Sequence, residues 1–187
     1  PMFPVEFEGL ESPRQQMDRF KELRAGFPLQ SLPFDVRKST MALFMAETLY
    51  RLVRESEPND PLFEFVWNST AALDALEEGV SNFHLWFLAN LSRLLGFRPG
   101  NDYRPGWWFD IREGLYTATS PLHPGSMTPD CAQLLDRMLH CDVRRLGEIE
   151  LNRTRRSDFL NAMLSYFGYH LDAISTVRSV HILREVF

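Results

Sequence analysis

The pattern of apolar and polar residues changes near residue 26. In the segment FPVEFE at residues 3–8, apolar residues alternate with proline or glutamate, which is the period of a half-buried strand. The segment RQQMDRFKEL at residues 14–23 is ambiguous. In a strand, Gln16, Asp18 and Phe20 would point to the same face, so a strand fits only if these three residues do not all need one face. Two strands do not make an independent domain. We therefore predict that residues 1–26 are the last strands of a unit whose beginning is absent from this chain.

From Asp35 onward the apolar residues recur at helical spacing. Helix starts are indicated by residues that cap free backbone N–H groups: Asp35, Asp60 followed by proline, and Thr128. The segment at 82–95 is apolar nearly all round, so we expect it to be the central helix. The sequence predicts a mainly α domain over residues 27–187 with six helices, at residues 35–57, 60–79, 82–95, 129–141, 152–171 and 175–187.

Two ionisable residues lie among apolar neighbours on these helices. Lys38 is on the opposite side of its helix from the polar stripe, so we expect a carboxylate or carbonyl partner for its ammonium group. His84 lies in the central helix, where a core or boundary histidine with satisfied hydrogen bonds is the favoured interpretation over a catalytic base.

The loop RPGNDYRPGWWFDIREG at residues 98–114 is rich in glycine and proline, yet it contains Tyr103, Trp107, Trp108 and Phe109. Its end, WWFDI, and the following LYTAT could form a short hairpin. The aromatic residues are either exposed stacking platforms for nucleobases or a plug packed onto the core.

The charge of −5 does not itself indicate nucleic-acid binding, but it is unevenly spread. Residues 55–92 contain seven acidic residues and no lysine or arginine, so the rest of the chain carries +2. Basic residues gather at 37–38, 93–112 and 144–156. A locally basic face is therefore possible, and ordinary solvated helix faces are the alternative.

The sequence offers no motif for catalysis, a cofactor or a metal. A phosphate-binding glycine loop, a nucleophile elbow and a zinc-protease histidine pair are all missing from the sequence. Cys131 and Cys141 suit reduced thiols in a cytoplasmic protein, and His123 and His140 do not complete a standard zinc spacing with them. No apolar run is long enough to span a membrane, and no signal peptide is visible. We expect a protein that is not an enzyme and has no cofactor.

Several segments in order resemble one family. PLQSLPFDVRKSTMALFMAETLYRLVRESEPNDPLFEF, GVSNFHLWFLANLSRLLGFRPG, FDIREGLY and the closing YHLDAISTVRSVHILREVF resemble the helical C-terminal domain of bacterial RecO proteins, in their Bacteroidetes-type form. The resemblance covers residues 27–187. It implies that residues 1–26 are the last strands of an OB-fold whose front part is missing from this chain.

The resemblance implies a recombination mediator rather than an enzyme. RecO proteins bind single- and double-stranded DNA, anneal strands coated with single-stranded DNA-binding protein, and with RecR help to load RecA. We expect a cytoplasmic, nucleoid-associated protein, and because the OB-fold is the main expected DNA site, weak DNA binding by this chain alone. Candidate phosphate contacts are Arg98, Arg104, Arg144, Arg145, Arg153, Arg155 and Arg156.

The helical domain of relatives also takes the acidic, phenylalanine-ended tail of single-stranded DNA-binding protein. By resemblance the groove lies between the helix at 60–78 and the start of the helix at 82–95. This chain departs from relatives that carry arginines there, so the cations would come from elsewhere. Candidate residues are Phe83, His84, Trp86 and Phe87 for the apolar wall, and Arg51, Arg54 or Arg93 for the cation.

Many relatives hold a structural zinc with two Cys-x-x-Cys pairs where this chain has its aromatic loop. We therefore expect Trp108 and Phe109 to pack in place of the metal, and leave Tyr103 and Trp107 as candidates for ligand contact. A helical interaction module without DNA binding is the alternative function. The two are distinguished by whether residues 144–156 share one face with Arg98, Arg104 and Arg112.

Overall fold

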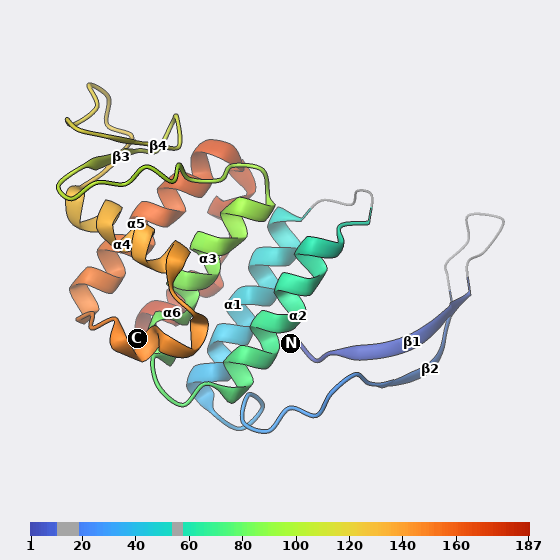
Figure 1. The fold of residues 1–187 in the computed structure, drawn as a ribbon. Coiled ribbons are helices and arrows are strands. Elements are labelled where there is room, and N and C mark those ends of the chain that lie inside the picture. Colours follow the sequence, from blue (N-terminus) through green and yellow to red (C-terminus); the bar gives the residue numbers. More distant parts are fainter. Residues whose placement is uncertain (11–18, 54–57) are drawn as a thin grey trace.

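A computed structural model describes residues 1–10, 19–53 and 58–187, and most of this part of the chain is helical (Figure 1). The α-helices are α1 (Val36–Leu52), α2 (Asp60–Ala75), α3 (Phe83–Leu94), α4 (Pro129–His140), α5 (Arg153–His170) and α6 (Ser179–Val186). Short 3-10 helices are η1 (Val80–Asn82), η2 (Val143–Glu148) and η3 (Asp172–Thr176). The strands are β1 (Val5–Leu10), β2 (Arg19–Ala25), β3 (Trp108–Asp110), β4 (Leu115–Thr117) and β5 (Ser126–Met127). The predicted mainly α architecture is confirmed.

Helix starts follow the capping chemistry that the sequence indicated. The Asp35 carboxylate accepts hydrogen bonds from the N–H groups of the next turn, and Thr128 caps α4 in the same way. The cap of α2 is Asn59 and not Asp60, as its side chain accepts from the N–H of Leu62. That prediction was wrong by one residue because Asp60 already belongs to the first turn.

The central position of α3 is confirmed. Its residues Leu85, Phe87, Leu88, Ala89 and Leu91 have no exposed surface. It packs against α1, α2, α4 and α5, and in Figure 1 these helices surround it. The apolar surface of α3 is therefore buried in the core on nearly every side.

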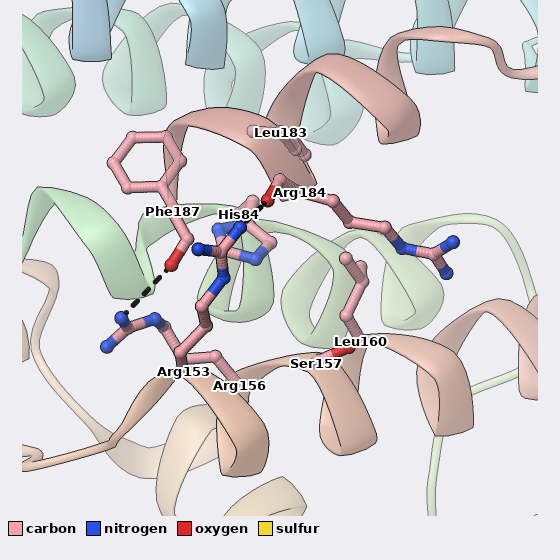
Figure 2. A pocket seen from close by; sticks show the side chains of 8 residues that line it. All are labelled: His84, Arg153, Arg156, Ser157, Leu160, Leu183, Arg184 and Phe187. Carbon is pink, nitrogen blue, oxygen red and sulfur yellow. Dashed lines mark hydrogen bonds between the residues drawn. The ribbon is translucent and has the colours of Figure 1, made fainter.

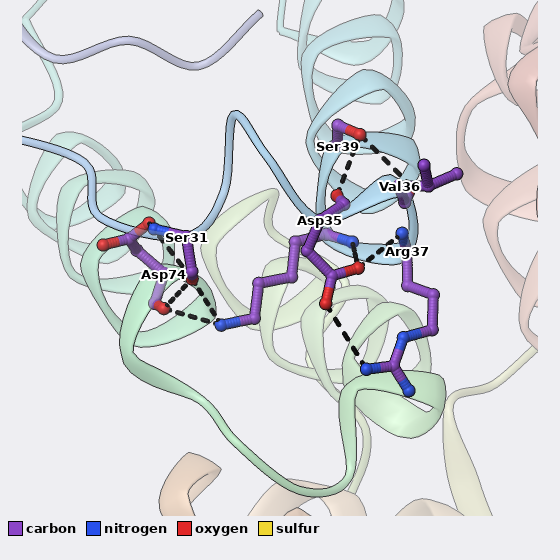
Figure 3. Close-up of polar contacts among 7 residues, drawn as sticks. Ser31, Asp35, Val36, Arg37, Ser39 and Asp74 are labelled. Atoms are coloured by element: carbon purple, nitrogen blue, oxygen red, sulfur yellow. Dashed lines mark hydrogen bonds and ion pairs between the residues drawn. The ribbon is translucent and has the colours of Figure 1, made fainter.

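A polar clamp fixes the start of α1 to the end of α2 (Figure 3). Lys38 Nζ lies 2.6 Å from both the Ser31 hydroxyl and the backbone carbonyl of Asp74, which confirms the predicted carbonyl partner. The Asp74 carboxylate accepts from the N–H groups of Gln30, Ser31 and Leu32 at 2.6–2.9 Å. Burial acts to raise the pKa of Asp74, but these donors and Lys38 hold the pKa below its ordinary value.

Strands β1 and β2 pair antiparallel into a ribbon that extends away from the helices (Figure 1). Phe3, Phe7, Phe20 and Leu23 on this ribbon are at least half exposed. The strand predicted at residues 3–8 is confirmed with bounds two residues later, at Val5–Leu10. Residues 19–23 of the ambiguous second segment belong to β2, and residues 14–18 lie outside the described residues. The division into domains at residue 26 stays a prediction.

The aromatic loop packs onto the core instead of standing free. Phe109 has no exposed surface, and its ring lies 5.2 Å from that of Tyr166 on α5. Tyr103 and Trp107 pack against the same core, whereas Trp108 is half-buried and does not belong to it. Trp108 was the wrong choice: it is the first residue of β3, and the buried side chains of this strand are those of Phe109 and Asp110.

The predicted hairpin is confirmed as β3–β4, and β5 adds a third strand to it. A staple closes this sheet: His123 Nε2 lies 3.0 Å from the buried Asp110 carboxylate, while His123 Nδ1 accepts from the N–H of Gly125. Since Nδ1 is an acceptor, Nε2 carries the proton and donates to Asp110. His123, considered from the sequence only as a metal ligand, is thus a partner of Asp110.

Candidate functional site

A pocket of about 230 Å³ lies where the starts of α3 and α5 meet the end of α6 (Figure 2). Its lining residues are His84, Arg153, Arg156, Ser157, Leu160, Leu183, Arg184 and Phe187. They combine an apolar wall with three arginines. Sequence reasoning assigned His84 to one candidate site and Arg153 and Arg156 to another, and the fold brings the three together.

Helical spacing explains this convergence. Arg153, Arg156 and Leu160 recur at three- and four-residue intervals, so they lie on one face of α5. The N-cap of α5 is Asn152, whose side chain accepts from the N–H of Arg155. This cap fixes where α5 starts and therefore which side of it faces α6.

The guanidinium groups in the pocket bind backbone oxygens and a side-chain amide oxygen. Arg153 Nη2 donates to the carbonyl of Arg184, and Arg156 donates to the carbonyls of Leu151 and Phe187, the latter at 3.3 Å (Figure 2). Arg184 Nη2 donates to the amide oxygen of Asn161. Across residues 1–10, 19–53 and 58–187, none of these three arginines has an Asp or Glu carboxylate within ion-pair distance. No acidic side chain of this part of the chain compensates their positive charge, so the pocket favours an anion.

His84 is the buried polar group of this pocket. Only 3% of its surface is exposed, and Nδ1 has no hydrogen-bond partner within the described residues. Burial, with a smaller effect of the Arg156 charge, lowers the pKa of His84 to about 3, so the ring is neutral near pH 7. The prediction of a buried, non-basic histidine is confirmed, but the expectation that its hydrogen bonds are satisfied is wrong for Nδ1.

The surroundings of Arg156 also disfavour the charged form of its guanidinium. Burial and then the neighbouring Arg153 charge lower the pKa of its guanidinium, and its Nε atom is buried without a partner in the described part of the chain. Unpaired polar atoms of His84 and Arg156 thus lie in the walls of one pocket. Nothing in the sequence pattern could reveal this, since it depends on how α3, α5 and α6 meet.

The predicted groove between α2 and α3 is filled by side chains. Phe83 and Phe87 have no exposed surface, and Phe65 of α2 stacks on Phe87 at 5.5 Å. Trp86 is half-buried and donates its Nε1–H to the carbonyl of Cys141 at 3.2 Å. A ligand could reach Phe83 or Phe87 only if α2 moved away, because α3 is buried on that side.

The candidate cations for that groove do not converge there either. Arg51 is exposed on α1, with its guanidinium 5.7 Å from the ring of Tyr50. Arg93 is exposed near the end of α3, beside Asn90. Arg54 lies outside the described residues. Of the residues proposed for the tail site, His84 alone lines the pocket at α3, α5 and α6.

The arginines proposed for DNA contact occupy separate environments. Arg144 pairs with Asp142, and Arg145 with Glu148 at 2.7 Å, so their charges are partly compensated. Arg155 is exposed on α5. Arg98 is exposed, and exposed Arg104 lies 5.0 Å from the ring of Trp107.

The loop arginines and those of residues 144–156 lie toward different ends of α5. Arg112 Nε is 3.0 Å from the hydroxyl of Tyr169, whereas Arg156 lies in the first turn of the same helix. Thirteen residues separate Tyr169 from Arg156, which corresponds to roughly 20 Å along the axis. Arg112 and Arg156 are therefore too far apart along α5 to belong to one compact basic patch.

The pocket does not assemble a catalytic set. His84 and Ser157 both line it, but no hydrogen bond joins them and no carboxylate lines the pocket. Within the described ranges, no three residues of the types His, Cys, Asp and Glu come together as a possible metal site. Burial raises the pKa of both Cys131 and Cys141, so neither is an activated thiol. None of the described helices has the length and apolar character needed to cross a membrane.

Comparison with known proteins identifies relatives along the whole chain. A family model described as "Recombination protein O C terminal" matches residues 33–178. A Phocaeicola vulgatus protein named DNA repair protein RecO is 34% identical over 188 residues, which cover 100% of this chain and 78% of that protein. The proteins of the same name from Bacteroides fragilis and Flavobacterium psychrophilum are 36% and 30% identical, covering 100% of this chain and 78% and 77% of their own lengths. The family model ends just before α6, whereas these relatives align across it.

Proposed function

Because this chain belongs to the RecO family and so has a role in DNA repair and recombination, we propose that it is a recombination mediator and not an enzyme. In this role it works with DNA strands, single-stranded DNA-binding protein and RecR to assist RecA loading. A cytoplasmic, nucleoid-associated location follows from that role.

The pocket at α3, α5 and α6 is the proposed site for the tail of single-stranded DNA-binding protein. An acidic peptide that ends in phenylalanine needs an apolar surface for its ring and cations for its carboxylates. Leu160 and Leu183 supply the first, and Arg153, Arg156 and Arg184 supply the second. The observation that carries this proposal is the absence of any carboxylate partner for these arginines within the described residues. The proposal moves the tail site from the filled groove between α2 and α3.

A binding titration tests the tail site. A fluorescently labelled acidic peptide ending in phenylalanine should bind the chain with a dissociation constant below about 100 μM. Arg156→Gln and Arg153→Ala should each weaken binding about tenfold, since each removes a charged contact that contributes roughly 1.4 kcal/mol or more. Arg145→Ala is the matched control, because Arg145 is exposed and paired with Glu148 away from the pocket. Absence of peptide binding at a protein concentration of about 100 μM would contradict the proposal.

DNA contact by this chain is proposed for the exposed Arg98, Arg104 and Arg155, with the paired Arg144 and Arg145 contributing less and Arg153 and Arg156 turned toward α6. Separated contacts of this kind bind phosphates weakly and with strong salt dependence. The principal DNA surface is proposed to be the OB-fold to which β1 and β2 would belong.

A helical interaction module without DNA binding is the second candidate. It is favoured by the net charge of −5 and by the placement of the arginine groups toward different ends of α5. Mobility-shift titrations at about 50 mM and 200 mM salt separate the two. Binding of single-stranded DNA by the chain that falls steeply with salt supports the mediator with DNA contacts, and no binding at the lower salt supports the second candidate.

A further inference from the structure

The last turn of α6 contributes Arg184 and Phe187 to the lining of the pocket. The ring of Phe187 stacks on that of His84, with centroids 6.1 Å apart and an interplanar angle of 28°. Two arginines hold the backbone of this turn: Arg156 through the Phe187 carbonyl and Arg153 through that of Arg184 (Figure 2). An aromatic ring and backbone oxygens of the chain itself thus use the groups available to an incoming ligand.

The two ends of α6 are held very differently. At its start the Glu47 carboxylate accepts from the N–H groups of Arg178 and Ser179 at 3.0 and 2.7 Å. Val180 and Leu183 are buried in the core, which anchors the helix as far as Leu183. The side chains of Arg184, Glu185 and Val186 are exposed, so the last turn depends on the arginine contacts and the Phe187 ring. That turn can therefore detach while the start of α6 stays in place.

The guanidinium groups of Arg153 and Arg156, which hold this turn, would bind a carboxylate more tightly than they bind a backbone carbonyl. A bidentate guanidinium–carboxylate pair is stronger and more specific than a single hydrogen bond from a guanidinium to a backbone carbonyl. The Arg184 carbonyl therefore holds Arg153 less firmly than the carboxylate of a ligand would. A ligand with a carboxylate and an aromatic ring can replace the turn without leaving a buried charge unpaired.

We propose that residues 184–187 are an internal plug that blocks the pocket and must be displaced for the acidic, aromatic-ended peptide to bind. The identity of that peptide rests on the proposed function, but the plug itself rests on the contacts of Phe187, Arg156 and Arg153. The plug weakens the apparent affinity for the peptide, because the apparent dissociation constant equals the intrinsic one divided by the fraction of molecules in which the pocket is open.

Removing the plug side chain tests this proposal. Phe187→Ala should lower the dissociation constant of the labelled peptide about three- to tenfold. Phe34→Ala is the matched control, since Phe34 is 82% exposed, lies before α1 and does not line the pocket. Unchanged or weaker peptide binding by Phe187→Ala would show that Phe187 is a wall of the site and overturn the plug, while the tail site would stand.

A second probe keeps the test independent of the peptide. Pyrophosphate is titrated into both proteins while the ring signals of His84 are followed by NMR. With the plug present the wild-type signals should respond at higher pyrophosphate concentration than those of Phe187→Ala. Equal responses, or none in either protein, would contradict the plug. A failure of the peptide alone, with a pyrophosphate response that differs between the two, would reject the proposed ligand and retain the plug. Thermal melting of each variant confirms that it is folded.

Discussion

Asp74 shows how a single carboxylate can join segments that are far apart in sequence. It accepts from three backbone N–H groups of residues 30–32, and its own carbonyl receives the Lys38 ammonium. The chain that enters α1 is therefore attached to the end of α2 by polar contacts as well as by packing.

Asp74→Ala should lower the free energy of unfolding by about 2–3 kcal/mol, because it leaves these donors without an acceptor. Urea denaturation measures the change, and Glu64→Ala, an exposed acid on the same helix, should change it little. The folded-state pKa of Asp74 is below the unfolded value, so its contribution is present above about pH 4 and is lost as the pH falls through the folded value. A wild-type protein whose acid sensitivity matched that of Asp74→Ala would contradict this assignment.

His84 should make folding sensitive to pH in a higher range. Its pKa is about 3 in the folded protein, and the ordinary value is 6.5, so the unfolded chain binds the proton first. Stability is therefore complete above about pH 6.5 and falls progressively between about pH 6.5 and 3, by up to several kcal/mol. The positive charge of Arg156, which lines the same pocket, reinforces this direction.

His84→Leu removes the titrating group and should flatten the fall in unfolding free energy between about pH 6.5 and 4.5. Urea melts across this range check the slope. His123→Ala provides a comparison in which another histidine is removed and the His84 slope is retained. An unchanged slope in His84→Leu would mean that another group controls stability there.

Single residues were predictable to the extent that local pattern determines their surroundings. Lys38 could be assigned a carbonyl partner because its helix face was evidently buried. The unpaired Nδ1 of His84 could not be foreseen, since it depends on the approach of α5 and α6. The choice between Trp107 and Trp108 failed for a similar reason: the sequence did not reveal which of two adjacent residues faces inward.

At the scale of elements, helix interiors were well predicted and helix ends less so. Apolar spacing and caps located α1, α4 and α5, but α2 ends at Ala75, before the predicted residue 79. The reason is tertiary. Gly79 has φ 75°, and a Cβ atom there would lie 2.4 Å from the backbone N of Gly147 in η2. The chain leaves α2 early in order to pass this close to η2.

Gly79→Ala should therefore destabilise the fold by at least about 3 kcal/mol, because strain in the left-handed region is added to a backbone collision. Gly96→Ala is the matched control, with φ 91° and no heavy atom within 4 Å of the added Cβ. It should cost only about 1–2 kcal/mol. Thermal melting of both variants gives the comparison, and equal losses would mean that the contact with η2 is not tight.

At the scale of the whole molecule, the β1–β2 ribbon and the helical body are joined by few contacts. The Phe27 and Trp67 rings meet 5.0 Å apart at the junction, and the space beside Gly26 is filled by the same tryptophan. No pair formed by a ribbon strand and a helix is among the closely packed element pairs of the described residues. The helical body is therefore expected to be stable without the ribbon.

A chain that begins at Phe27 should keep its helical circular dichroism and a cooperative thermal transition within about 5 °C of the original, since about 1 kcal/mol or less is lost. This also tests the predicted division of the chain at residue 26. Loss of the cooperative transition would assign the ribbon to the same folding unit as the helices.

The Asp110–His123 contact affects how the aromatic loop responds to oxidation. This closure uses a carboxylate and an imidazole, and residues 98–127 contain no cysteine whose thiolate peroxide could oxidise. Oxidising conditions damage DNA, and they also oxidise the thiolates that hold a zinc ion. A zinc site in a repair protein would therefore be lost under the same conditions in which DNA repair is needed. In this protein the loop, and the end of α5 on which it rests, would keep their shape through an oxidative burst.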